Sequence, residues 1–169
     1  MESNFKNPNI ASFLKRNHIA VLATANRETG EPHAATVYYA TDSQMNVFFF
    51  TKQETKKNKN LTSNPRAALA IYEAATQSTA QISGPVTAVN DPDIIEKAHR
   101  LMKKYSKETA QSEDTPLSKL YAGDYILYKV WPQIIRLGEY KYGPAGEIFD
   151  TATPAEELLS QDLQQDSQG

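Results

Sequence analysis

Short runs of apolar and β-branched residues, separated by turn-forming residues, make up most of the chain. Each run has the length of a strand, and glycine, proline, asparagine, aspartate or serine stands between neighbouring runs, which is typical of antiparallel sheets. The predicted strands are 18–24, 33–41, 46–51, 66–73 and 78–89, followed by a strand pair or one long bent strand over 125–137, interrupted at Pro132. Gly84 and Pro85 in the fifth run indicate a bulge or an edge position.

Helical periodicity is restricted to a few segments. An asparagine followed by proline opens a predicted helix over 7–17, and an aspartate followed by proline opens another over 91–105 with a continuous apolar stripe. A short helix is also expected to end at Asn64. Other predicted segments are a loop at 106–116, a helical turn at 117–121 and a glycine-containing loop at 140–146. Because strands outnumber helices and do not alternate with them, the order favours a six-stranded antiparallel barrel with helices packed outside.

Composition narrows the class of protein further. With 169 residues the chain is long enough for one core, and its net charge of −2 provides no global field for nucleic acid or anionic lipid. Cysteine is absent, which excludes disulfides, a thiol nucleophile and a cysteine zinc site. No apolar run is long enough for a signal peptide or a membrane span. We expect a soluble, cytoplasmic protein with one domain over 1–150 and an acidic, disordered tail over 151–169.

Candidate catalytic groups are sparse. The glycine fingerprint of dinucleotide folds and the phosphate loop of nucleotide hydrolases are both missing. The three histidines, His18, His33 and His99, have no spacing that would place two metal ligands on one face, so we expect no metal site. No serine has the elbow sequence of a hydrolase. The chain therefore either does no chemistry or takes it from a bound cofactor.

One stretch, 48–65, carries a pattern that suits a phosphate group. An aromatic strand end leads into Thr51 and a loop in which four lysines stand against a single acid, Glu54, before a short helix. Hydroxyl groups at Thr51 and Thr55 and backbone N–H groups at a helix start can donate to phosphate oxygens, while ammonium groups neutralise the charge. The alternative is a solvated, lysine-rich turn.

The same stretch resembles the pyridoxamine 5′-phosphate oxidase-like FMN-binding split barrel superfamily. In that family a strand ending in aromatic-Thr is followed by a Ser/Thr-x-Lys element, a Leu and Asn-Pro. Here these fall on Phe50-Thr51, Thr55-Lys56-Lys57, Leu61 and Asn64-Pro65, and the resemblance extends from Ile10 to Leu137. The resemblance implies a mainly β fold with flanking helices, a six-stranded antiparallel split β-barrel of the FMN-binding type.

Carried over residue by residue, the resemblance implies an FMN phosphate site in this loop. Lys57 would be the principal phosphate ligand, Thr55 a hydroxyl donor to the phosphate, and Lys56 a second positive charge. Phe50 and Thr51 would lie along the flavin near the ribityl chain. For Phe50, packing in the core is the alternative.

The resemblance also implies contacts to the flavin ring. Thr36, Val37 and Tyr38 would offer backbone groups to the ring edge, although core packing is the alternative for Val37. In the family the flavin lies between two subunits, so Trp131 and Arg136 would approach the flavin bound mainly by the partner chain. For Trp131 too, burial in the core is the alternative.

Two departures from the family pattern bear on the activity. Ala35 stands where the true pyridoxamine phosphate oxidases have an arginine for the flavin phosphate, and 138–147 lacks their closing tryptophan and arginine/histidine cluster. The chain looks more like the short branches of the superfamily, which bind FMN or a related flavin, deazaflavin or haem. The resemblance thus implies an FMN-dependent flavin oxidoreductase of unknown substrate. The alternatives are a non-catalytic module that holds or senses a flavin or haem, and a plain structural dimer.

Aromatic side chains are dense on the predicted strands and bear on assembly. Neighbours such as Tyr38 and Tyr39, or Phe48 and Phe49, point to opposite sides of a strand, so one barrel interior cannot enclose them all. Some can lie under the helix over 91–105, and the others would form an exposed patch of the kind that homodimer interfaces use. We therefore expect a two-fold homodimer with two flavin sites at its seam, and neither nucleic acid nor membrane as a partner.

Overall fold

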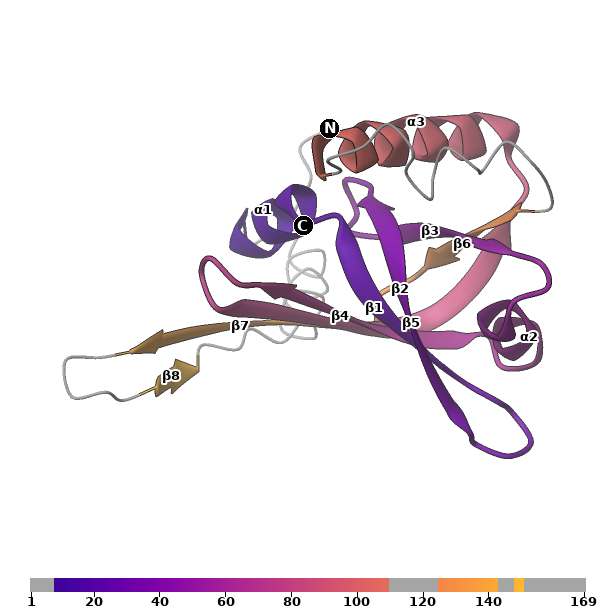
Figure 1. Ribbon diagram of the computed structural model, residues 1–169, viewed down its shortest axis with the longest axis horizontal. Helices are drawn as coiled ribbons and strands as arrows, with labels where there is room; N and C mark the ends of the chain where they lie inside the picture. The colour runs from indigo at the N-terminus through magenta and orange to yellow at the C-terminus, as the bar shows by residue number, and fades with distance from the viewer. Residues whose placement is uncertain (1–7, 110–124, 143–147, 151–169) are drawn as a thin grey trace, which may run out of the picture.

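The computed structural model describes residues 8–109, 125–142 and 148–150, and Figure 1 shows their strands wound into a barrel with helices around it. Six strands pair in a ring in the order β4 (Arg66–Glu73), β1 (Ile19–Ala25), β2 (Pro32–Thr41), β3 (Val47–Lys52), β6 (Tyr125–Val130) and β5 (Ser78–Val89), which returns to β4. All these pairs are antiparallel. The mainly β, six-stranded antiparallel barrel expected from the sequence is confirmed.

Two further strands extend the sheet beyond the barrel. β7 (Ile134–Tyr142) pairs with β5, and β8 (Ile148–Asp150) pairs with β7. The interruption at Pro132 therefore separates two strands, and the alternative of one long bent strand is wrong. The loop predicted at 140–146 is wrong for 140–142, because these residues continue β7 along β8. The rest of that predicted loop lies outside the described residues.

In the part of the chain that the structure describes, three helices flank the strands: α1 (Pro8–Arg16), α2 (Lys56–Ser63) and α3 (Pro92–Thr109). The Asp91 carboxylate caps α3 as its sequence predicts, accepting hydrogen bonds from the backbone N–H groups of Asp93 at 2.9 Å and Ile94 at 3.3 Å. The loop predicted at 106–116 is wrong for 106–109, which continue α3. The remainder of that loop, the helical turn at 117–121 and the tail at 151–169 lie outside the described residues.

The split in the barrel occurs at Gly84. Along one edge of β5, residues 78–83 pair with β7 and residues 86–89 pair with β6, so two strands exchange places at this point. The backbone N–H of Trp131 donates to Pro85 O and that of Gln133 donates to Ser83 O, both at 2.9 Å. A Cβ atom on Gly84 would lie 1.9 Å from the carbonyl oxygen of Trp131. The glycine is therefore required by the close approach of the chain segment that connects β6 to β7.

Alternation along the strands gives the barrel one interior and two different outer faces. Leu22, Tyr39 and Leu69 are among the interior side chains. On the outer side of β2, β3 and β6, which we call the covered face, α3 lies across the strands in Figure 1. The side chains that meet there are Ala40, Phe48 and Leu127 from the strands and Ala98 and Met102 from α3.

The outer side of β1, β4, β5 and β7, which we call the exposed face, has no helix across it among the described residues. Val21, Tyr72 and Ile134 are 46%, 64% and 39% exposed there. Of the strand aromatics, Tyr39, Phe49 and Tyr128 lie in the barrel core and Tyr38, Phe48 and Phe50 in the cluster under α3. The patch left open is therefore more aliphatic than the aromatic count suggests.

Candidate functional site

The predicted phosphate loop folds as a tight turn between the end of β3 and the start of α2. Thr55 is the N-cap of α2, with extended backbone angles of φ −76° and ψ 153°, and its hydroxyl accepts a hydrogen bond from the backbone N–H of Asn58 at 3.4 Å. The same hydroxyl donates to the carbonyl oxygen of Lys52 at 2.8 Å. The loop thus delivers the chain directly into a helix whose first N–H groups have no intrahelical acceptor.

Two hydroxyl groups meet at this helix start. Oγ1 of Thr51, the penultimate residue of β3, is hydrogen-bonded to Oγ1 of Thr55 at 2.9 Å. Thr51 is only 3% exposed, so its hydroxyl is held by the fold and not by solvent. The structure therefore brings together the two threonines that the sequence singled out.

The four lysines of the loop have different surroundings. Lys57 is half-buried, and this burial lowers the pKa of its ammonium group. Lys56 Nζ lies 2.6 Å from Oε1 of Glu31, and this hydrogen bond lowers the pKa of the exposed Glu31 carboxyl. Lys59 is exposed on α2, and Lys52 Nζ lies 5.7 Å from the centroid of the Tyr125 ring. Of the four, Lys57 has the least solvated charge, and Lys56 already has an acidic partner.

Three side-chain bonds fasten α2 to the barrel, and sequence reasoning did not assign this role to the residues that make them. Asn60, which is buried, donates to Thr24 Oγ1 at 3.1 Å, and the buried Tyr128 donates to Asn58 Oδ1 at 2.7 Å. Asn64 Nδ2 donates to the carbonyl oxygen of Ala25 at 3.3 Å. Asparagine is a weak helix former. Three asparagines within and just after one short helix could therefore have indicated that their side chains form tertiary hydrogen bonds.

The other sequence-predicted site residues are distributed around the barrel. Val37 is buried in the core, and Tyr38 and Phe50 pack into the cluster under α3. Their side chains are thus engaged in packing, while their proposed contacts with the flavin stay predictions. Thr36 is exposed on β2 and pairs with Val21 in the register of β1.

Trp131 and Arg136 lie in separate places. The Trp131 side chain is 44% exposed, its Nε1 donates to Thr87 Oγ1 at 3.1 Å, and Lys129 Nζ lies 3.5 Å from its ring centroid. Core burial, the alternative considered for this tryptophan, is therefore wrong. Arg136 lies on β7 opposite Gln81 and faces a hollow in the exposed face.

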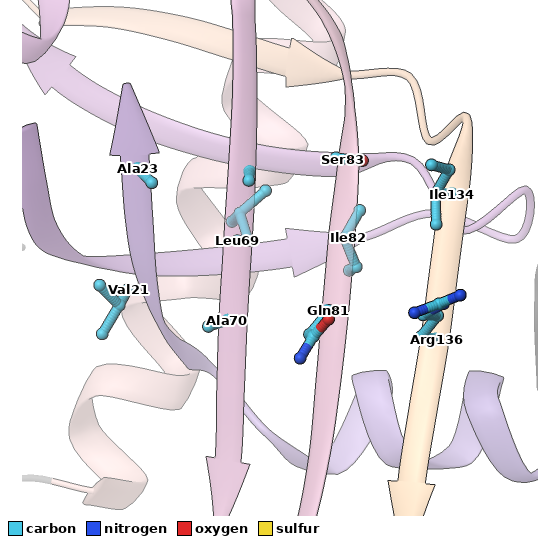
Figure 2. Close-up of a pocket in the computed structure, with 10 residues that line it drawn as sticks. Val21, Ala23, Leu69, Ala70, Gln81, Ile82, Ser83, Ile134 and Arg136 are labelled. Carbon is cyan, nitrogen blue, oxygen red and sulfur yellow. The ribbon is translucent and has the colours of Figure 1, made fainter. Parts of the chain in front are cut away.

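Figure 2 shows this hollow, which has a volume of about 620 Å³. Small side chains on neighbouring strands form much of its floor: Ala23 on β1, Ala68 and Ala70 on β4, and Ser83 on β5. Val21 and Ile134 stand at its sides, and Arg136 and Gln81 provide its polar groups. The alternating alanines of β1 and β4 are visible in the sequence. That they lie on the same face of the sheet follows only from the pairing of the two strands.

Other kinds of site find little support in the described residues. They contain no group of three histidine, cysteine, aspartate or glutamate residues that could hold a metal ion. None of their helices has both the length and the apolar character needed to cross a membrane.

Comparisons with known proteins agree with the fold. Residues 7–126 match the family model described as pyridoxamine 5′-phosphate oxidase. The chain is 27% identical over 166 residues to pyridoxine-5′-phosphate oxidase of Bos taurus; the match covers 83% of this chain and 60% of that enzyme, less than two thirds of its length.

Two solved structures share the architecture. One is a pyridoxamine 5′-phosphate oxidase-related, FMN binding protein from Nostoc punctiforme, with a TM-score of 0.55 and 16% identity over 85% of this chain and 94% of that one. The other is HutZ, a haem storage protein from Vibrio cholerae, with a TM-score of 0.59 and 15% identity over 75% of this chain and 89% of that one. At such identities the likeness establishes the fold alone.

Proposed function

Because the chain belongs to the pyridoxamine 5′-phosphate oxidase family, we propose that it binds FMN and acts as a flavin oxidoreductase. The observation that carries this proposal is the cluster at the start of α2, where the bonded hydroxyls of Thr51 and Thr55 and the half-buried Lys57 meet free helix N–H groups. The helix N–H groups and the Lys57 ammonium group are the donors that a phosphate monoester requires, and the two threonine hydroxyls, which donate within the loop in the free protein, would turn toward the phosphate on binding. The Nostoc punctiforme fold relative is described as FMN binding, which adds support.

Each residue of the cluster has a distinct task in this proposal. Lys57 neutralises the phosphate, and the partial loss of its hydration in the free protein reduces the desolvation still to be overcome on binding. Thr51 and Thr55 supply hydroxyl groups, and Tyr128 holds α2 in place through Asn58. Lys56 contributes a second positive charge. Its ammonium group is bonded to Glu31, so the phosphate has to compete with that carboxylate. When bound, the flavin would supply hydride or electron transfer, and these residues supply position and polarity.

The exposed face supports a homodimer as the assembled form. Its large apolar side chains surround a hollow, and soluble monomers seldom leave such a patch uncovered. We propose that a second copy covers this face by two-fold symmetry and that Arg136 of each chain approaches the flavin held by the other. Trp131 contacts Lys129 beside Phe48 of the covered face, away from this seam, so its expected approach to the partner's flavin is not part of the proposal.

The substrate is a separate question from the cofactor. Ala35, half-buried on β2, occupies the position where the true oxidases have an arginine for the flavin phosphate. The vitamin B6 reaction of the curated relatives is therefore not part of the proposal. A small molecule that exchanges electrons with a flavin is the class that the site supports.

A second candidate is a non-catalytic module that holds or senses a flavin or haem. The observation in its favour is the chemistry of the described cluster, whose side chains are hydroxyl, amide and ammonium groups with no carboxylate or imidazole placed as a general base. HutZ, which shares the fold, is a haem storage protein.

Visible spectroscopy tests binding, and stopped-flow reduction separates the two candidates. Titration with FMN should give saturable binding with a shifted flavin spectrum; failure to bind FMN would remove the oxidoreductase proposal, and binding of haem instead would favour the second candidate. Reduction of bound FMN by NADH or NADPH, followed by oxidation by an acceptor, would support the enzyme. Bound flavin that no donor reduces across a broad panel would favour the module.

A further inference from the structure

A second concavity lies on the covered side of the barrel, where α3 leaves part of the strands open. It has a volume of about 440 Å³ and is formed by the first half of α3, the end of β2, the start of β3, and single residues of α1 and β6. It shares no lining residue with the hollow of the exposed face. Thr51, Thr55 and Lys57 are not in its lining either, so the groove has to be explained separately from the proposed FMN phosphate cluster.

The floor of the groove is apolar. Phe48 of β3 and Ala98 of α3 are buried beneath it, and Leu101 of α3 is half-buried at its side. Ile94, one turn before Ala98, is 41% exposed although it faces the same groove. An apolar chain laid along this floor would remove Ile94 from water and extend the cluster under α3.

The rim of the groove is cationic. Lys15 of α1, Lys97 of α3 and Lys129 of β6 come from three separate elements to line it. Among the described residues, no carboxylate lies within ion-pair distance of any of these three ammonium groups. The acid in the lining, Asp42, accepts hydrogen bonds from Gln44 and Asn46 and is engaged in its own turn.

One of the three cations is also held in position. Lys129 Nζ lies 5.6 Å from the centroid of the Phe48 ring and 3.5 Å from that of Trp131. The indole is fixed in turn by its bond to Thr87 at 3.1 Å. A cation fixed between two aromatic rings loses less conformational freedom when an anion binds to it than a free lysine would.

We propose that this groove binds a small anionic amphiphile, a molecule with one carboxylate or phosphate head and a single medium-length acyl chain. The head lies among the three lysines, and the chain lies over Phe48, Ala98 and Ile94. Charge complementarity and the apolar floor select this class over neutral or cationic amphiphiles, because a neutral head leaves the lysines without a counter-charge and a cationic head is repelled.

The protein carries its own reporter for this binding. Trp131 is the only tryptophan in the chain and its ring contacts Lys129, so an anion on Lys129 should change its fluorescence. Dodecanoate, titrated below its micelle concentration, should give a saturable change, whereas dodecanol and dodecyltrimethylammonium should not. Dodecyl phosphate should bind like dodecanoate. Vesicles of phosphatidylglycerol should not co-sediment with the protein, since the groove accepts one chain and not a surface.

Charge-reversal variants locate the site. Lys15→Glu and Lys97→Glu together should weaken dodecanoate binding at least tenfold, and Ile94→Asp should weaken it several-fold. Lys59→Glu, which makes on α2 the charge change of either single substitution, should leave it unchanged. Lys57→Ala should also leave it unchanged, which separates this proposal from that for FMN. Absence of a saturable signal, equal weakening by Lys59→Glu, or equally tight binding of dodecanol would overturn the proposal.

Discussion

The two outer faces of the barrel are made by the same alternation of residues but differ in what lies over them. On the covered face, Phe48 and Leu127 pack against Met102 of α3, which is fully buried. On the exposed face, Val21 and Ile134 occupy the equivalent outward positions and remain open. The strand pattern is thus the same on both sides, and within the described residues a helix covers one side only.

This difference shows that an outward apolar residue is not by itself a sign of an interface. α3 follows β5 directly, begins at a strong cap and presents an apolar stripe, so one face is covered within the chain. No comparable helix follows the strands of the other face within the described residues. The apolar surface left there is what a second copy of the chain would cover.

The largest effect should come from removing a side chain beneath α3. Met102→Ala deletes a fully buried side chain and should lower the free energy of unfolding by about 2–5 kcal/mol. Tyr72→Ala on the exposed face, where the ring is 64% exposed, should change the stability of the monomer by less than about 0.5 kcal/mol. Urea unfolding at dilute protein concentration measures both. Similar losses for the two variants would mean that the faces do not differ as described.

Assembly is the next test of the comparison. Ile134→Asp places a charge at the side of the hollow in the exposed face and should weaken the dimer by about 2 kcal/mol or more, roughly thirtyfold in Kd. Ile94→Asp is the matched control, because Ile94 is 41% exposed on α3 where Ile134 is 39% exposed on β7. Light scattering at low micromolar concentration distinguishes dimer from monomer. A wild-type monomer, or a dimer broken only by Ile94→Asp, would contradict the proposed interface.

Flavin affinity should follow the phosphate cluster and not the charge of the loop. Lys57→Ala should weaken FMN binding by about 1.5–3 kcal/mol, at least tenfold, because a charge-assisted bond to phosphate is lost. Lys59→Ala removes the same charge from an exposed position and should have little effect. Fluorescence titration of FMN measures the affinities, and equal losses would show that the loop acts only through its net charge.

The same FMN titration tests whether flavin binding depends on the dimer interface at the exposed face. If the flavin is shared between chains, Ile134→Asp should weaken FMN at concentrations where the wild type is a dimer, while Ile94→Asp should not. FMN bound with unchanged affinity by a monomeric Ile134→Asp variant would place the whole site within one chain.

The smallest effect concerns an ion pair at the end of β4. The Arg16 guanidinium, with Thr76 and Asn17, donates hydrogen bonds to Glu73 and lowers the pKa of its carboxyl to about 2. A carboxyl whose pKa is depressed in the folded state stabilises the protein above its unfolded pKa, near 4.5, and this contribution is lost as the pH falls toward 2.

Glu73→Gln should therefore cost about 0.2–1 kcal/mol at pH 7, as expected for a partly exposed pair, and much less near pH 2. Urea midpoints of wild type and variant at the two pH values measure this difference. A loss that is the same at both pH values would mean that the carboxylate charge is not what stabilises the contact between α1 and β4.

Local patterns were sufficient for most of the fold. The strand ranges were predicted to within one residue for β1 to β5, since their alternation and their turn residues are local properties of the chain. The start of α3 was set by Asp91 and Pro92 in the same way. Its end was placed too early, because 106–109 are polar and carry no apolar signal of a helix.

The candidate site divides along a similar line. Thr51 and Thr55 were found because a strand end and a helix cap need no distant partner, whereas Lys57 was chosen among the four lysines through the resemblance. The hydrogen bond from Tyr128 to Asn58 joins residues 70 positions apart, and no local sequence pattern predicts it. Arg136 was named through a resemblance, but its position beside the hollow follows from the pairing of β7 with β5.

The sequence by itself determined the kinds and order of most elements, the absence of cysteine chemistry and the turn of threonines and lysines before α2, because these depend on residues within a few positions of one another. Only the tertiary structure decided which outward residues would be covered. The side of the barrel that receives α3 depends on the closure of six strands and on the exchange of β6 for β7 at Gly84. Such long-range pairing determines which apolar residues are left for a partner and which lysines gather around a groove.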